Sequence, residues 1–319
     1  MISGDEGMKL VSFFTAQGAE HIGALLDDGQ TIADFSQADP SPTFRSMLDL
    51  IDSGEPGLDR ARSLVRSASA TVRLDQVTLR APLPEPRQMR DFLSFEKHLR
   101  QARANRHLLG IAGMPSDPAK IELPAVWYKQ PIYYKCNRFS VVGTGTDVIW
   151  PRYSNVMDYE LEFGCVIGKD GKNLSRDEAR SHIFGWCIFN DFSARDAQMA
   201  EMAGQLGPCK GKDFDTGNVL GPWLVTADEI PDPYNLTMVA RVNGVEWSRG
   251  SSRDMRFRFE DFIEHVTADE RLRAGEFLGS GTVGSGCGLE LGRFLNDGDV
   301  VELEVSGLGI LRNRVIRQH

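Results

Sequence analysis

The sequence predicts a mostly β protein of the α+β class, in which a small α+β N-terminal unit precedes a larger, strand-rich domain. Beyond residue 88 most apolar runs are short, rich in β-branched and aromatic residues and separated by glycine, as in VVGTGTDVIW, ELEFGCVIG and VVELEVSGLG. Few segments have the length and 3.6-residue period of a long helix. A proline-rich stretch, APLPEPRQ at 81–88, divides the chain into predicted domains 1–80 and 81–319.

The N-terminal unit contains short strand patterns followed by helical ones. Strands are predicted at KLVSFFT (9–15) and HIGALL (21–26), then a helix near TFRSMLDLID (43–52) and a polar helical segment. A further strand, VTLRAPL (77–83), leads into the boundary.

The larger domain continues the strand pattern with FGWCIFND, GPWLVT and LTMVARVNG. Its predicted helices cover residues 92–109, 175–183 and 257–266. The segment 110–125 has three prolines and no sustained period, which suits a mobile cover over a site or an ordinary surface loop.

Bulk composition favours a small-molecule protein of a reducing compartment. The 319 residues are 41% hydrophobic and 25% charged, with a net charge of -9, which disfavours a nucleic-acid partner. No apolar run approaches the roughly 20 residues of a membrane span, and the start of the chain carries acids where a signal peptide has basic residues. Five scattered cysteines without a C-x-x-C pair indicate neither disulfides nor zinc, so a cytoplasmic location is predicted.

The stretch DYELEFGCVIGK (158–169) places three acids on one face of a predicted strand. Asp158, Glu160 and Glu162 alternate with Tyr159 and other apolar residues. Like charges on one face repel, so this face either meets water or holds a cation.

A second acidic signal is NDFSARDAQ (190–198), where a buried strand pattern ends at Asp191. The dipeptide also suits a turn or helix cap. Together with Glu160 and Glu162, Asp191 would complete an all-oxygen ligand set, which suits Mg²⁺, Mn²⁺ or Ca²⁺ and not zinc.

A third acid, Asp91, opens the predicted helix at 92–109, and His98 follows seven residues later on the same face. Asp91 is either an N-cap or a metal ligand, and His98 is either packed or a base close to that metal. The basic run Lys97, Arg100, Arg103 and Arg106 is a solvated helix face or attracts an anionic substrate.

Six motifs together resemble the fumarylacetoacetate hydrolase superfamily over roughly residues 80–310. They are RDF with His98 seven residues after Asp91, DYELEFGCVIGK, NDFSARDAQ, GKDFDTGNVLGPWLVT, FLGSGTVGSG and GCGLEL. The resemblance implies a β-rich roll of mixed sheets behind a small N-terminal domain, paired as a homodimer. It also implies one divalent cation, Mg²⁺ or Mn²⁺ with Ca²⁺ as a further option, and a small anionic oxo-acid substrate.

Position by position, the resemblance assigns roles to twelve residues. It implies metal ligands at Asp91, Glu160, Glu162 and Asp191, a catalytic His98 oriented by Glu290, oxyanion and substrate contacts from Lys212 and Gln198, and substrate contacts from Thr282, Tyr134, Arg103 and Arg106. The sequence departs from fumarylacetoacetase itself at Leu93, where a tyrosine is expected, and at His107, where an arginine is expected. Asp158 is expected at the rim of the site or paired with a basic residue.

The expected activity is hydrolysis of a C–C bond in a 1,3-diketo acid, an acylpyruvate or fumarylacetoacetate-like compound, by water that His98 and Glu290 activate. The alternative within the superfamily is a decarboxylase, lyase or isomerase acting on an oxaloacetate-like or ureidoglycolate-like acid. A third possibility is a non-catalytic domain whose carboxylates hold a structural ion.

Overall fold

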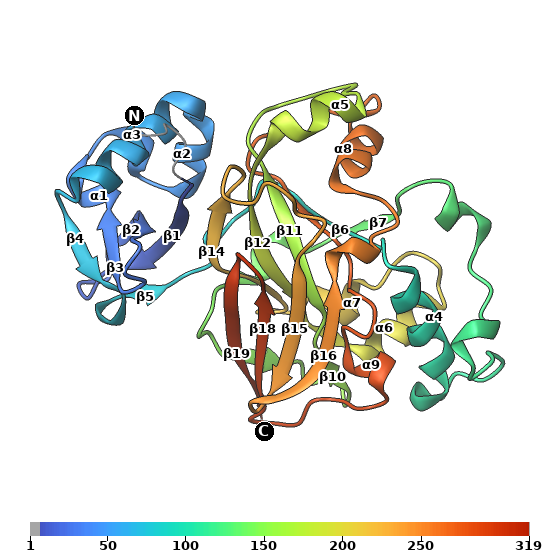
Figure 1. Ribbon diagram of the computed structural model, residues 1–319. Helices are drawn as coiled ribbons and strands as arrows, with labels where there is room; N and C mark the ends of the chain where they lie inside the picture. Colours follow the sequence, from blue (N-terminus) through green and yellow to red (C-terminus); the bar gives the residue numbers. More distant parts are fainter. Residues whose placement is uncertain (1–6, 319) are drawn as a thin grey trace.

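The computed structural model describes residues 7–318, and its N-terminal unit lies at one end of the molecule (Figure 1). A small antiparallel sheet forms this unit, in the order β4-β3-β2-β1, and β5 also pairs with β1. Its strands are β1 (Lys9–Phe14), β2 (Glu20–Leu25), β3 (Thr31–Asp34), β4 (Thr71–Arg73) and β5 (Thr78–Leu79), and its helices are α1 (Phe35–Ala38), α2 (Met47–Asp52) and α3 (Gly54–Ser67). The predicted strands and helices therefore form, although α2 is shorter than expected.

The N-terminal sheet continues directly into the sheet of the larger domain. Strand β1 pairs antiparallel with β14 (Asn218–Thr226), where Leu10 lies opposite Leu224. Apolar side chains of both units, among them Leu10, Phe44, Phe184 and Phe277, form one buried cluster. A shared sheet and a shared core therefore join the two predicted units, and the boundary near residue 80 stays a prediction.

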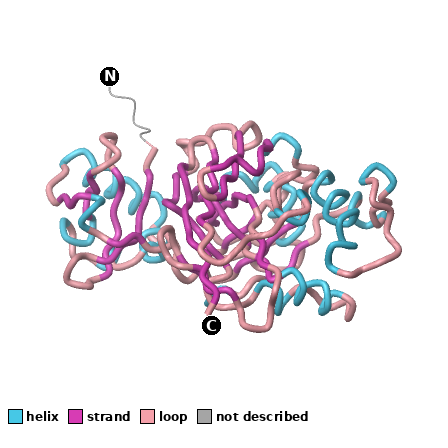
Figure 2. Tube along the Cα trace, turned by 90° about the horizontal axis from the view of Figure 1, so that it is seen from below, coloured by secondary structure: helices cyan, strands magenta, loops and turns pink. Residues whose placement is uncertain are grey.

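Two sheets dominate the larger domain. The large sheet continues from β1 in the order β14-β12-β11-β17-β6-β7, with β8 beside β14, and the second sheet has the order β16-β15-β18-β19-β9. The strands that follow β5 are β6 (Met89–Phe92), β7 (Tyr133–Lys135), β8 (Val141–Val142), β9 (Val148–Trp150), β10 (Met157–Asp158), β11 (Leu161–Ile167), β12 (Ile183–Asp191), β13 (Ser193–Ala194), β14, β15 (Thr237–Val242), β16 (Val245–Ser251), β17 (Phe277–Gly279), β18 (Val300–Val305) and β19 (Gly309–Arg317). Figure 2 shows the strands gathered in the middle of the molecule.

The helices of this domain are short and lie around the sheets (Figure 1). They are α4 (Glu96–Ala104), α5 (Arg176–Ala179), α6 (Arg195–Met202), α7 (Cys209–Lys212), α8 (Phe259–Thr267) and α9 (Gly288–Leu291). Within residues 7–318, no helix has both the length and the apolar character that a membrane crossing needs.

The prediction of one helix over 92–109 is wrong at its start. Residues 89–92 form β6, which pairs with β17 on one side and with β7 on the other, so Asp91 is a strand residue and not a helix cap. The backbone bonds of a central strand outweigh the capping preference of an aspartate. Helix α4 begins at Glu96 and is followed by a 3₁₀ turn, Asn105–Leu109.

The apolar face predicted for DYELEFG is confirmed, but the prediction of one strand is wrong, because Asp158 ends β10, Glu160 forms an isolated bridge with Cys287 and β11 begins at Leu161. The acidic side chains also do not meet water. Tyr159, Leu161 and Phe163 belong to the main apolar core. Asp158 and Glu162 are fully buried, and Glu160 is nearly so. The solvated-face interpretation is therefore wrong, because both faces of this segment are covered.

The segment 110–125 contains one 3₁₀ turn, Pro118–Lys120, and most of its residues are exposed. This arrangement fits a surface loop, and a covering motion over the site stays a prediction.

Candidate active site

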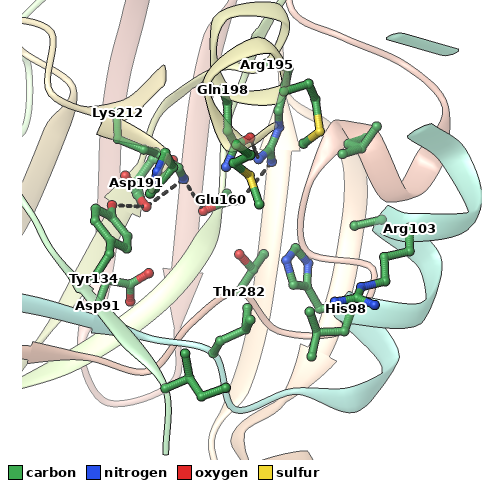
Figure 3. Close-up of a pocket in the computed structure, with 18 of the residues that line it drawn as sticks. Asp91, His98, Arg103, Tyr134, Glu160, Asp191, Arg195, Gln198, Lys212 and Thr282 are labelled. Carbon is green, nitrogen blue, oxygen red and sulfur yellow. Dashed lines mark hydrogen bonds and ion pairs between the residues drawn. The ribbon is translucent and has the colours of Figure 1, made fainter. Parts of the chain in front are cut away.

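A pocket beside α4, α6 and α7 brings most of the predicted site residues together (Figure 3). The lining includes Asp91, His98, Arg103, Arg106, Tyr134, Glu160, Asp191, Gln198, Lys212 and Thr282. The other two predicted residues, Glu162 and Glu290, lie behind this lining and contact residues that form it. Segments as distant in sequence as β6 and the loop after β17 thus meet at one site.

Three carboxylates from three strands of the large sheet form a compact cluster at the wall of this pocket. Asp91 is on β6, Glu162 on β11 and Asp191 on β12, and one oxygen of each lies within 4.8 Å of the other two. The Oε2 of Glu162 and the Oδ1 of Asp191 are buried without a hydrogen-bond partner. Gly279, opposite Asp91 on β17, leaves room for the carboxylate, because a Cβ there would come within 2.5 Å of Asp91 Oδ1.

This cluster is electrostatically unfavourable as it stands. Burial and then the charge of Asp191 raise the pKa of Asp91 to about 8. Burial, and to a smaller extent the negative charge of Asp91, holds the pKa of Glu162 well above its usual range. Burial raises the pKa of Asp191 to about 6, although Lys212 opposes the shift.

The three carboxylates fit a divalent cation. Unpaired oxygens in a buried, crowded set are what a cation would satisfy, and hard oxygen donors suit Mg²⁺, Mn²⁺ or Ca²⁺. The cluster is therefore a candidate site for one divalent ion.

Glu160, the fourth predicted ligand, is engaged by two cations instead. Its Oε2 lies 2.6 Å from Lys212 Nζ, and its Oε1 lies 2.8 Å from Arg195 Nη2. Burial alone would raise the pKa of Glu160, but Lys212 and Arg195 lower it strongly. Lys212 also donates to Asp191 Oδ2 at 2.6 Å, so its ammonium group links Glu160 to the carboxylate cluster (Figure 3).

Arg195 is the residue that the motifs did not single out. Its Nε donates to Asp158 Oδ2 at 2.8 Å, and its Nη1 donates to Gln198 Oε1 at 2.9 Å. Asp158 is buried, so its expected place at the rim is wrong and its expected pairing with a basic residue is confirmed. The signal was present in the sequence, since Arg195 stands three residues before Gln198 and would share its helix face.

His98 and Glu290 form a pair on the opposite wall of the pocket. His98 is on α4, Glu290 is on α9, and His98 Nδ1 lies 3.1 Å from Glu290 Oε2. Backbone N–H groups of Ser285 and Cys287 donate to the two oxygens of Glu290 and fix its carboxylate. Burial lowers the pKa of His98, but the interactions with Glu290 and the charge of Glu160 together outweigh this effect, so the pKa is raised overall.

Three further predicted residues connect to these groups. The hydroxyl of Tyr134 donates to Asp191 Oδ2 at 2.6 Å, and the hydroxyl of Thr282 donates to Glu162 Oε1 at 3.1 Å. Gln198 faces the pocket from α6. Tyr134 and Thr282 thus hold the carboxylate cluster as well as lining the cavity.

The outer part of the pocket carries Arg103 and Arg106. Burial lowers the pKa of both guanidinium groups, and the Nε of Arg103 is buried without a hydrogen-bond partner. Leu93 lines the pocket at the position where fumarylacetoacetase has a tyrosine. His107 is exposed and does not reach it.

Comparison with known proteins gives three findings. The fumarylacetoacetate (FAA) hydrolase C-terminal family model matches residues 88–316. The chain is 32% identical over 312 residues to a mitochondrial oxaloacetate tautomerase of Xenopus laevis, covering 97% of this chain and 90% of that protein. It is 30% identical over 311 residues to an oxaloacetate tautomerase of Bacillus subtilis, covering 92% and 95%.

Among solved structures, one named as a 2-hydroxyhepta-2,4-diene-1,7-dioate isomerase of Mycobacterium abscessus aligns with a TM-score of 0.73 at 30% identity. The alignment covers 98% of this chain and 100% of that one. This likeness confirms the predicted fold class of mostly β mixed sheets.

Proposed function

Since the chain belongs to the fumarylacetoacetate hydrolase family, as its motifs predicted, we propose that it interconverts the enol and keto forms of oxaloacetate or a similar small 2-oxo dicarboxylate. Two relatives that align over more than nine-tenths of the chain are named oxaloacetate tautomerases. Their names favour the isomerase alternative over the C–C hydrolase that the motifs first suggested. The observation that carries the proposal is a buried His98 held against Glu290 and facing a pocket with cationic groups.

Tautomerisation needs one group that moves a proton to and from carbon. His98 lines the pocket, and Glu290 lies beside its Nδ1, which leaves Nε2 as the atom that exchanges a proton with C3 of the substrate. Toward the enol, the neutral ring takes a proton from C3 while water protonates the enolate oxygen. Toward the keto form, the imidazolium returns the proton to C3 while the enol hydroxyl gives its proton to water. Glu290 raises the pKa of His98, which favours the imidazolium that returns the proton to carbon.

The negative charge that develops on the substrate oxygen needs cationic partners. Lys212 keeps its proton because Asp191 and Glu160 raise the pKa of its ammonium group despite burial. It therefore offers a fixed positive charge at the carboxylate side of the pocket. Asp91, Glu162 and Asp191 would hold a Mg²⁺ or Mn²⁺ ion, which would supply polarisation of the 2-oxo group, while Glu160, the predicted fourth ligand, would hold Lys212 beside it.

Arg103 and Arg106 suit the distal carboxylate of the substrate. Both lack a carboxylate ion-pair partner among the described residues, and both face the pocket. Planar guanidinium groups bind carboxylates well. Gln198 and Thr282 would supply hydrogen bonds to the substrate between these two ends.

The direct test follows the loss of enol absorbance of oxaloacetate on the magnesium-loaded full chain. His98→Gln should lower the rate by about 10²- to 10⁴-fold, the usual contribution of a positioned acid or base. His107→Gln is the matched control, because that imidazole is exposed and outside the pocket. An unchanged rate in His98→Gln would remove His98 from the mechanism and overturn the proposal.

The second candidate is hydrolysis of an acylpyruvate. The His98–Glu290 pair favours it, because the same pair could activate a water molecule. Incubation with a panel of acylpyruvates, with pyruvate release as the readout, separates the two reactions. Pyruvate formation at a rate exceeding oxaloacetate tautomerisation would make the hydrolase the main activity.

We also propose that the chain forms a homodimer and has no nucleic-acid or membrane partner. Light scattering of the purified chain tests the dimer.

We propose a cytoplasmic location, because the cysteines are scattered and, within residues 7–318, form no disulfides. The rival is a mitochondrial location, which the name of the Xenopus relative suggests. Fluorescent tagging of the full chain in its own cells distinguishes the two.

A further inference from the structure

Across the pocket from the carboxylate cluster, His98 and two residues behind it form a second group of possible metal ligands of a different chemical kind. A ring nitrogen of His98, the Sγ of Cys287 and an oxygen of Glu290 lie within 4.8 Å of one another, and all three residues are buried. The proposed reaction uses His98 and Glu290 but gives the thiol of Cys287 no part. We propose that these three residues form a second metal site, for a thiophilic divalent cation such as Zn²⁺.

The ligand types select the ion. Thiolate and imidazole are preferred by Zn²⁺, whereas Mg²⁺ and Ca²⁺ prefer oxygen donors such as those of Asp91, Glu162 and Asp191. The two sites are therefore matched to different metals. One carboxylate and one thiolate also neutralise the charge of the ion.

The geometry needs only a small adjustment. Tetrahedral zinc bonds of about 2.0–2.3 Å place neighbouring ligand atoms roughly 3.3–3.8 Å apart. His98 Nδ1 and Glu290 Oε2 are already 3.1 Å apart, and the sulfur, within 4.8 Å of both residues, would need to approach by about 1.5 Å at most.

A second observation points to an absent partner at the same place. His98 Nδ1 is buried and makes no hydrogen bond of acceptable geometry, although Glu290 Oε2 is close. A buried ring nitrogen that neither donates nor accepts a hydrogen bond is energetically unfavourable. A metal ion between the three groups would satisfy it.

The surrounding charges favour a cation. The charged groups that act most strongly on the Cys287 thiol are the carboxylates of Glu290, Asp158 and Glu160 and the guanidinium of Arg195. Burial and Glu290 raise the pKa of this thiol well above its usual range, so the metal-free thiol stays protonated. Binding would release that proton to solvent as the thiolate joins the ion.

Access to the site is through the catalytic pocket. His98 lines the pocket, while Cys287 and the side chain of Glu290 have no exposed surface behind it. An ion in this site would occupy the lone pair of His98 and separate it from Glu290. Zn²⁺ would then inhibit proton transfer, and this consequence alone rests on the proposed role of His98.

The test uses the full chain with its carboxylate cluster saturated with Mg²⁺ and adds Co²⁺ as the probe. Thiolate ligation of Co²⁺ gives a near-ultraviolet charge-transfer band that oxygen ligands do not give. One equivalent of Co²⁺ should produce the band, Zn²⁺ should displace it, and Cys287→Ser should abolish it. Because no substrate is involved, failure of the tautomerase proposal leaves this result unaffected.

Two other thiols provide matched controls. Cys136→Ser removes the thiol whose pKa responds to Asp191 and Asp91, and Cys209→Ser removes the exposed thiol. Both variants should keep the band. Absence of the band in the unmodified protein, or its survival in Cys287→Ser, would overturn the proposal.

A variant-independent measurement covers the case in which Cys287→Ser does not fold. Anomalous diffraction at the zinc edge, from crystals of the unmodified protein with Mg²⁺ and Zn²⁺, should place a peak within bonding distance of Cys287 Sγ. A zinc peak found only among Asp91, Glu162 and Asp191 would count against the second site.

Discussion

Binding of Mg²⁺ to the carboxylate cluster should release protons, and its affinity should rise with pH. The metal-free cluster holds protons because burial and the neighbouring carboxylates raise the pKa of Asp91 to about 8 and hold the pKa of Glu162 well above its usual range. At pH 7 a carboxyl group with a pKa of about 8 is roughly nine-tenths protonated. At least one proton must therefore leave when the cation arrives.

The magnitude follows from one displaced proton. Each pH unit below the pKa of Asp91 costs about 1.4 kcal/mol, so the dissociation constant for Mg²⁺ should fall about tenfold per unit from pH 6 to about 8. Above that range the contribution of Asp91 should disappear. Displacement of a second proton, from Glu162, whose pKa is also raised, would steepen the curve below about pH 8 and maintain a slope above it.

Isothermal titration calorimetry measures both quantities. Titrations at one pH in buffers of different ionisation enthalpy count the protons released, and titrations from pH 6 to 9 give the slope. Asp177→Asn, an exposed carboxyl on α5, is the control and should change neither. A pH-independent affinity with no proton release would refute the reasoning, because it would mean that the cluster is ionised before the metal binds.

Three further predictions concern the same pocket. Lys212→Met should lower turnover by about 10²- to 10³-fold and should destabilise the fold, because two buried carboxylates lose their cationic partner. Turnover with oxaloacetate and thermal unfolding measure the two effects, and Lys210→Met, at an exposed position, is the matched control. Glu290→Gln should shift the titration of His98, followed by NMR, to lower pH, because Glu290 raises the pKa of that imidazole. An unchanged titration would show that Glu290 does not act on His98. In the presence of a chelator, the free energy of unfolding should fall as pH rises from about 4 to about 8, because Asp91 keeps its proton in the folded state and loses it in the unfolded chain. Mg²⁺ at 100 times its dissociation constant should add about 2.7 kcal/mol to that free energy at a given pH. An equal unfolding temperature with and without Mg²⁺ at pH 8 would contradict the assignment of the carboxylate cluster as the metal site.

The sequence was sufficient for the fold class because short strand patterns are local signals. Most site residues were instead assigned through the resemblance of the motifs to a family, and their individual roles stay predictions. Short, glycine-separated β runs predicted the sheets, and the motif residues converged on one pocket as expected. The sequence could not show that the N-terminal unit shares a sheet with the larger domain. Pairing of Leu10 with Leu224 joins positions more than two hundred residues apart, and no local pattern specifies such a contact.

The error at Asp91 has a different cause. An acid followed by a helical period looks like an N-cap, and this local preference is worth only about 1 kcal/mol. The residues around Asp91 instead form backbone bonds with two flanking strands, and Gly279 makes room for its carboxylate. Tertiary pairing therefore decided the conformation, while the functional placement of Asp91 in the pocket was still predicted.

The three acids of DYELEF show which functional features a periodic sequence pattern can predict and which it cannot. The alternation correctly placed Asp158, Glu160 and Glu162 on one face, but each meets a different set of charges. Asp158 is neutralised by Arg195, and Glu160 by both Arg195 and Lys212, whereas Glu162 keeps one buried oxygen without a partner. A cation has most to stabilise at Glu162 and least at Glu160, so Glu162→Gln should weaken Mg²⁺ binding more than Glu160→Gln does.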